Sequence, residues 1–205
     1  NKIGFSAVAS ACLMELLKRQ RDAVGLSVYA DSYEYYAPEK GSERHRNMLL
    51  HQLEQLLQPS KNKTTTTETY KYLHEIAEKI HRRSLIFLFT DMFQTSTSNQ
   101  ELFEALRHLK YNKHEVVLFH TFDADTEMNF NFEKVSKKFV DVETGIEVQL
   151  HTDNIQETYK KSIEKYFKEL KTKCLQYQIE YVPVSINEGF MDVLTSYLIS
   201  RRKIL

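Results

Sequence analysis

The stretch Leu85-Ile86-Phe87-Leu88-Phe89-Thr90-Asp91 decides how the rest of the chain is interpreted. Its run of large apolar residues predicts a β-strand that is buried on both faces. The strand ends on a threonine and a carboxylate, and ligands of open α/β sheets bind outside the carboxyl ends of the strands. This position places Asp91 where a metal ion or a phosphate group would be held. The alternative is that Asp91 is the N-cap of the helix that follows.

Helical and strand-like segments alternate on both sides of this stretch. Apolar residues at three- and four-residue steps predict an amphipathic helix over residues 3–20 and further helices around Leu53, Ile76, Leu106, Phe167 and Leu194. Strands are predicted for residues 24–30, 116–122 and 179–184, with 33–37 as a continuation of the first strand or its hairpin partner. This alternation predicts an α/β fold, with a mostly parallel sheet that carries helices on both faces.

The stretch from Met128 to Leu150 breaks the alternation. Apolar residues alternate there with polar ones on both sides of the turn signal Thr144-Gly145. This pattern predicts a small antiparallel β insert with one solvent-exposed face. The insert is either a ridge that binds a partner or a cover for a sheet edge.

Length and charge limit the possible functions. With 205 residues, the chain is long enough for one well-packed domain over residues 1–205. Its 28 basic residues balance its 28 acidic residues, which argues against a nucleic-acid partner. The chain has no run of about 20 apolar residues that would span a membrane. Cys12 and Cys174 lie on apolar helical faces, and we expect a reducing, cytoplasmic location.

The beginning of the chain also carries an expectation. Asn1 stands directly at the edge of the first predicted helix. In an α/β sheet, the first helix normally follows a strand. We therefore expect a central strand upstream of Asn1, and a domain that is truncated at its N-terminus.

The run Thr64-Thr65-Thr66-Thr67 precedes the third predicted helix. A threonine hydroxyl at this position either caps the helix or ligates a hard cation. Together with Asp91 it would form part of a magnesium site made of oxygen ligands. Glycine-rich phosphate loops and the G-x-S-x-G motif are absent, and the histidines lack metal-ligand spacing. We interpret His74, His81, His108, His114 and His120 as surface or hydrogen-bonded residues.

Several ordered segments are similar to the bacterial family called domain of unknown function 58, which has a von Willebrand factor A-like fold. The matching segments are 22–31 (DAVGLSVYAD), 38–42 (PEKGS), 81–84 (HRRS), 89–92 (FTDM), 114–118 (HEVVL), 141–145 (DVETG) and 179–182 (IEYV). The resemblance implies a Rossmann-like sheet with a metal-ion-dependent adhesion site at its carboxyl edge.

Such a site uses an Asp-x-Ser-x-Ser motif after the first strand, a threonine before a later helix and an aspartate after the fourth strand. Asp91 matches the aspartate, and Thr67 is our choice for the threonine. Asp-x-Ser-x-Ser does not occur in this sequence and would belong to the expected upstream strand. The resemblance therefore implies that Mg²⁺ or Mn²⁺ binds only when that upstream segment is present.

Genes of this family often neighbour those of MoxR-type AAA+ ATPases, so the resemblance implies such an ATPase as the protein partner. The function expected first is a non-catalytic interaction module. The alternative is a Mg²⁺-dependent phosphotransfer or phosphatase enzyme with Asp91 as the nucleophile. Enzymes of the haloacid-dehalogenase type need a second aspartate two residues further on, where this chain has Phe93.

Overall fold

The computed structural model describes residues 1–29, 33–58, 69–92, 96–129, 136–140 and 147–202. The elements are α1 (Lys2–Arg19), β1 (Val24–Tyr29), β2 (Tyr33–Lys40), α2 (Glu43–Gln55), α3 (Thr69–Lys79), β3 (Leu85–Thr90), α4 (Ser96–Tyr111), β4 (Glu115–Phe122), η1 (Ala124–Met128), β5 (Ser136–Val140), β6 (Glu147–His151), α5 (Thr152–Gln176), β7 (Glu180–Ser185) and α6 (Phe190–Arg202).

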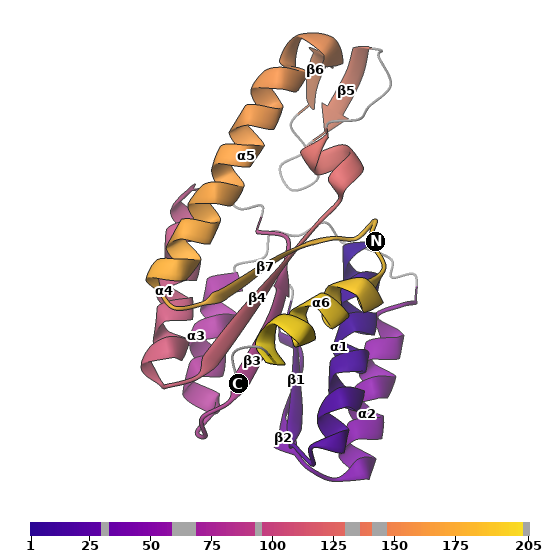
Figure 1. The fold of residues 1–205 in the computed structure, drawn as a ribbon, viewed down its shortest axis with the longest axis vertical. Coiled ribbons are helices and arrows are strands. Elements are labelled where there is room, and N and C mark those ends of the chain that lie inside the picture. The colour runs from indigo at the N-terminus through magenta and orange to yellow at the C-terminus, as the bar shows by residue number, and fades with distance from the viewer. Residues whose placement is uncertain (30–32, 59–68, 93–95, 130–135, 141–146, 203–205) are drawn as a thin grey trace.

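The central sheet of the described residues is parallel, in the order β3-β4-β7 (Figure 1). Leu85 pairs with Glu115 at one end of the β3–β4 ladder and Thr90 with His120 at the other. The carboxyl ends of β3, β4 and β7 therefore meet at one edge of the sheet, which we call the carboxyl edge. The predicted α/β fold with a parallel sheet is confirmed at this level.

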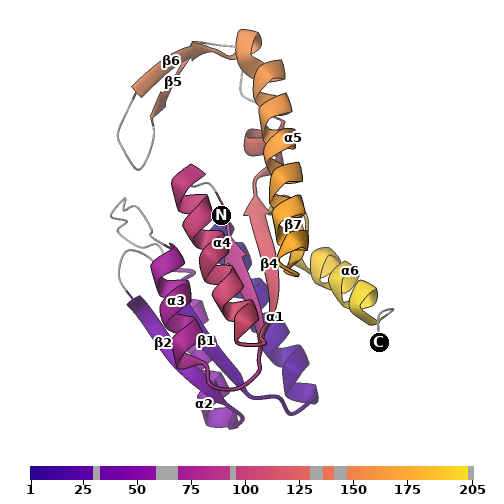
Figure 2. The same cartoon turned by 90° about the vertical axis from the view of Figure 1, so that its left-hand side faces the viewer.

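Helices cover both faces of this sheet (Figures 1 and 2). Side chains alternate along a strand, so Val116 and Leu118 of β4 pack with α3, α4 and α5, whereas Val117 and Phe119 pack with α1 and α6. β4 is buried over nearly its whole length. This double burial explains why its sequence is an almost unbroken apolar run.

β3 is less buried than its sequence predicts. Within Leu85–Thr90 only Leu88 is buried, and the other residues are half-buried. In the described part of the chain β3 is hydrogen-bonded to β4 and to no second strand. Its apolar run is therefore suited to a more central position than the described residues provide.

β1 and β2 form a separate antiparallel hairpin, which confirms the second of the two alternatives for residues 33–37. Val24 and Ala37 of the hairpin pack with Leu49 and Leu53 of α2 and with Met14 of α1. Within the residues that the structure describes, the β1–β2 hairpin and the central sheet are thus joined by helix packing rather than by strand pairing.

The predicted insert is antiparallel, as expected. β5 pairs with β6 from Ser136↔His151 to Val140↔Glu147, while the turn Thr144-Gly145 lies outside the described residues. The β5–β6 hairpin lies at the N-terminal end of α5, beyond the carboxyl edge, in both ribbon views (Figures 1 and 2). Between β4 and this hairpin the structure has the short π-helix η1, which the sequence patterns did not predict.

Three helices end in the same way. The residue after the C-cap has a left-handed backbone at Arg21 (φ 62°), Lys113 (φ 65°) and Gln178 (φ 56°). After α4, the amide of Lys113 donates to the carbonyl of Lys110, and the amide of His114 to that of Leu109. This pair of bonds is the Schellman arrangement, which normally favours glycine at the left-handed position.

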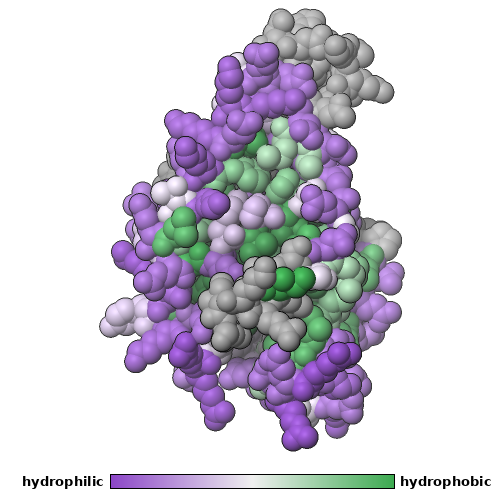
Figure 3. All heavy atoms as spheres, viewed as in Figure 1, coloured by the Kyte–Doolittle hydropathy of each residue, from purple (hydrophilic) through white to green (hydrophobic). Residues whose placement is uncertain are grey.

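The outer surface is mixed. Figure 3 shows hydrophobic surface in the middle of the molecule, in the region of β7 and α6, and hydrophilic residues towards both ends. α6 exposes Met191 and Ile199. Among the described residues, no helix combines the length and the apolar character needed to cross a membrane.

Candidate functional site

Asp91 lies directly after β3, at the carboxyl edge, in a tightly held turn. Met92 follows it with a left-handed backbone (φ 57°) and a fully buried side chain. This conformation is costly for a residue other than glycine and persists only where the surroundings impose it. The Oγ1 of Thr90 accepts a hydrogen bond from the amide of Met92 at 3.3 Å.

Two side chains from other elements hold the two carbonyl groups of this turn. His120 of β4 places Nε2 2.9 Å from the carbonyl oxygen of Asp91, and the hydroxyl of Tyr166 of α5 donates to the carbonyl oxygen of Met92. With both carbonyls bound, the direction in which the Asp91 side chain leaves the backbone is fixed. The turn is preorganised, which is typical of functional sites.

The surroundings of His120 determine its protonation state. A carbonyl can only accept, so Nε2 carries the hydrogen, and Nδ1 therefore accepts from the hydroxyl of Tyr181 at 2.7 Å. The imidazole is fully buried and packs against the ring of Phe167, with 4.6 Å between the ring centroids. Burial lowers the pKa of His120 to about 4, so the ring is neutral at pH 7.

The N-terminus of α1 lies at the same edge. Asn1 caps the helix, because its Oδ1 accepts from the amide of Gly4 at 2.7 Å. The ammonium group of Lys2 is 2.6 Å from Oε1 of Glu127 and 3.6 Å from Oδ2 of Asp91. One lysine thus bridges a carboxylate of η1 and the carboxylate that follows β3.

Two acidic side chains at this edge, Asp123 and Glu127, accept hydrogen bonds from the backbone. Oδ1 of Asp123 accepts from the amides of Asp125 and Thr126 at 3.0 and 3.3 Å, and Oε2 of Glu127 accepts from the amide of Asp123 at 3.1 Å. These bonds cap η1 as in a capping box. Asp91 differs from them, since its carboxylate is half-exposed and accepts no hydrogen bond from a described backbone amide.

Tyr29, at the end of β1, has a buried hydroxyl on which the charge of Asp91 acts. Burial raises the pKa of Tyr29, and the charge of Asp91 raises it further. Among the described residues this hydroxyl has no hydrogen-bond partner. A buried hydroxyl without a partner is energetically unfavourable.

The described residues at the carboxyl edge do not by themselves form a site for a divalent ion. Asp91 and Glu127 supply two carboxylates, but the ammonium group of Lys2 lies between them. No group of three His, Cys, Asp or Glu side chains suited to a metal ion occurs in the described part of the chain. Magnesium requires six oxygen ligands at short range, so additional ligands and a displaced lysine would both be needed.

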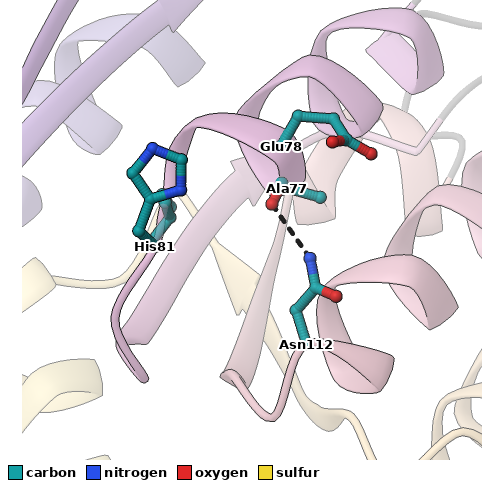
Figure 4. Close-up of a pocket in the computed structure, with 5 residues that line it drawn as sticks. Ala77, Glu78, His81 and Asn112 are labelled. Carbon is teal, nitrogen blue, oxygen red and sulfur yellow. Dashed lines mark hydrogen bonds between the residues drawn. The ribbon is translucent and has the colours of Figure 1, made fainter.

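A second surface feature lies at the opposite edge of the sheet. A pocket of about 360 Å³ is lined by Ala77, Glu78, Ile80, His81 and Asn112, near the end of α3. Asn112 donates from Nδ2 to the carbonyl of Ala77 at 3.0 Å. Figure 4 shows that the labelled side chains point in different directions around Ala77 rather than towards a common point. This arrangement holds the end of α3 and presents no converging set of catalytic groups.

The structure places Asp91 where the sequence predicts it, at the carboxyl end of β3. Thr67 and Phe93 lie outside the described residues, so the predicted threonine ligand stays a prediction. Lys2 and Glu127 were not predicted, and His120 was predicted only as a surface or hydrogen-bonded residue, without a role at this edge. For His120 a signal was present, because a polar residue two positions after Leu118 falls on the buried side of an otherwise apolar strand.

The remaining histidines fit the prediction in part. Nδ1 of His74 lies 3.2 Å from Nδ1 of His108, so these two side chains contact each other at the surface between α3 and α4. His114 is buried, and its Nδ1 accepts from the amide of Ser84. Its Nε2 is buried without a partner among the described residues, so His114 is hydrogen-bonded through one ring nitrogen.

A family model described as "Protein of unknown function DUF58" matches residues 1–169 of the chain. Neither the curated proteins nor the solved structures include a significant match.

Proposed function

The chain belongs to the DUF58 family of proteins of unknown function, and we propose that it is a non-catalytic protein-interaction module of von Willebrand A-like architecture. Its partner binds at the carboxyl edge, and Asp91 is the residue at the centre of the contact. The single observation that carries this proposal is the clamped turn at Asp91–Met92. A strained, buried turn that presents one half-exposed carboxylate is suited to recognition.

The strand pairing supports a von Willebrand A-like sheet. β1 pairs only with β2, and β3 pairs only with β4, within the described residues. A further strand from an upstream segment, inserted between β1 and β3, would join the hairpin to the central sheet. It would lead into α1, whose first residues lie beside Asp91. It would also give β3 the central position that its apolar sequence favours.

We propose that this upstream segment carries the Asp-x-Ser-x-Ser motif. Its carboxylate and hydroxyl oxygens would complete, with Asp91 and Thr67, an oxygen site for Mg²⁺ or Mn²⁺. The ion would keep one open position for an acidic side chain of the partner. The hydroxyl of Tyr29, which has no partner within the described part of the chain, supports an additional polar group in this region.

The partner that we propose is a MoxR-type AAA+ ATPase in the bacterial cytoplasm. The test is binding of the purified ATPase to the immobilised protein, extended upstream through the proposed strand, with Mg²⁺ and with a chelator. We expect Asp91→Ala to weaken binding at least tenfold. Asp22→Ala, which removes an exposed carboxylate at the other end of α1, should leave binding unchanged.

Two results would contradict the proposal. Equal binding by the Asp91→Ala variant would remove Asp91 from the interface. Turnover of a general phosphatase substrate with Mg²⁺, abolished by Asp91→Asn, would instead identify the protein as an enzyme with Asp91 as its nucleophile.

A further inference from the structure

The turn at Asp91 and Met92 is held by side chains from two different parts of the fold. Thr90 and His120 belong to β3 and β4, where they are paired residues of the central sheet. Tyr166 belongs to α5, and its hydroxyl donates to the carbonyl of Met92. The first two side chains keep their places as long as the sheet is intact, whereas a shift of α5 withdraws the hydroxyl of Tyr166.

These hydrogen bonds hold Met92 in a backbone conformation that is unfavourable by itself. Its φ of 57° lies in the left-handed region, where the side chain of any residue other than glycine is crowded. The strain energy of such a residue is similar in size to the net contribution of one or two hydrogen bonds. Loss of one hydrogen bond therefore shifts the balance between this conformation and an unstrained one.

Methionine is suited to a position with two backbone conformations. The Met92 side chain is fully buried, in the same cluster as Leu88 and Leu102, so it has to stay packed when the backbone changes. A methionine side chain is unbranched and has three rotatable bonds, so it can fill the same space from a shifted backbone. A β-branched side chain lacks this freedom.

Tyr166 reaches the turn from the middle of a packed helix. Ile163 and Leu170 of α5 are buried, and the ring of Phe167 packs against that of His120, with 4.6 Å between the ring centroids. Figure 2 shows that α5 continues past the carboxyl edge of the sheet. A partner at the carboxyl edge therefore has access to the same helix that carries Tyr166.

We propose that the turn exchanges between a clamped state, in which Tyr166 binds the carbonyl of Met92, and a released state, in which Met92 leaves the left-handed region. The described conformation is the clamped state. Release rotates the peptide group between Asp91 and Met92, so the Asp91 carboxylate changes direction and its contact with Lys2 at 3.6 Å is lost. The consequence for partner binding rests on the proposed function, whereas the exchange itself is a property of the turn.

The test is amide hydrogen exchange, measured by NMR on the full chain and on its Tyr166→Phe variant. Phenylalanine keeps the packed ring and removes only the hydroxyl. The reporter is the amide of Met92, which donates to Oγ1 of Thr90 in the clamped state and is free in the released state. We expect this amide to exchange at least tenfold faster in Tyr166→Phe, while the amide of Leu118 in the buried strand β4 keeps its rate.

Tyr177→Phe is the matched control. Tyr177 directly follows α5, and its ring stacks on that of Phe103 with 5.8 Å between the ring centroids. The replacement removes a tyrosine hydroxyl from a half-buried ring without touching the turn, so exchange at Met92 should not change. Equal acceleration in both tyrosine variants would overturn the inference.

Two further results would refute the two-state turn. An unchanged exchange rate of Met92 in Tyr166→Phe would show that the hydroxyl does not control the turn. Equal acceleration at Met92 and Leu118 would show a general loss of stability instead of a local release. Neither measurement involves the ATPase. If Asp91→Ala leaves ATPase binding unchanged, the proposed function fails, and the exchange rates still decide whether the turn has two states.

Discussion

Acidification should destabilise this fold through His120. The imidazole is fully buried, donates to the carbonyl of Asp91 and accepts from Tyr181. Burial lowers its pKa from the ordinary value of 6.5 to about 4. Between these two values the unfolded chain binds a proton that the folded chain does not. The free energy of unfolding is therefore greatest above about pH 6.5, falls as the pH drops towards 4, and stops falling on this account below it.

The loss of unfolding free energy follows from the change in the pKa of His120. One pKa unit corresponds to about 1.4 kcal/mol, so the displacement of the pKa from 6.5 to about 4 amounts to a loss of about 3 kcal/mol between pH 7 and pH 4. For a domain of ordinary stability this is a large part of the total.

The assay is urea unfolding at a series of pH values, for the unchanged protein and for His120→Gln. Glutamine keeps an amide donor for the Asp91 carbonyl but does not titrate. The difference between the two pH profiles isolates His120 from the other titrating groups. Replacement of His51, an exposed histidine of α2, controls for the loss of an imidazole from the surface. Parallel profiles for the unchanged protein and His120→Gln would refute the assignment of a buried neutral imidazole.

Four substitutions test other parts of the fold by thermal or urea unfolding. Lys113→Gly should stabilise the protein by about 1 kcal/mol, because glycine adopts the left-handed backbone without strain. Lys110→Gly, in the last turn of α4, should destabilise it by up to about 1 kcal/mol. Gly25→Ala should lower the free energy of unfolding by about 1–3 kcal/mol, because a Cβ atom there would lie 2.9 Å from the carbonyl oxygen of Ala37 across the β1–β2 hairpin. An unchanged unfolding midpoint would contradict this close approach. Leu106→Ala should lower the free energy of unfolding by about 2–5 kcal/mol, because the Leu106 side chain is fully buried between α4 and the sheet. A smaller loss would mean that the surrounding side chains fill the cavity.

The fold could be predicted where the signal is local. The apolar periodicity of α1 and the apolar run of residues 116–119 in β4 correspond to elements whose burial the sequence pattern encodes directly. The burial of β3 could not be predicted in this way, because it depends on which strand pairs with its second edge. The π-helix η1 is short and is held by its capping bonds at Asp123, which leave no periodic pattern.

Only part of the candidate site, likewise, could be predicted from the sequence. Asp91 was predictable, because it depends only on the strand that precedes it. Lys2 and Glu127 lie far apart in the sequence and meet only because α1 and η1 are both packed at the carboxyl edge. No spacing rule connects them. Their contact follows from tertiary packing, which a single sequence does not reveal.

The connection between β6 and α5 has a mechanical consequence. β6 ends at His151 and α5 begins at Thr152, so no loop separates the projecting hairpin from the helix. α5 has 25 residues, which corresponds to a rod about 37 Å long. Tyr166 and Phe167 of this rod contact Met92 and His120. A displacement of the β5–β6 hairpin would thus be transmitted through α5 to the turn that carries Asp91.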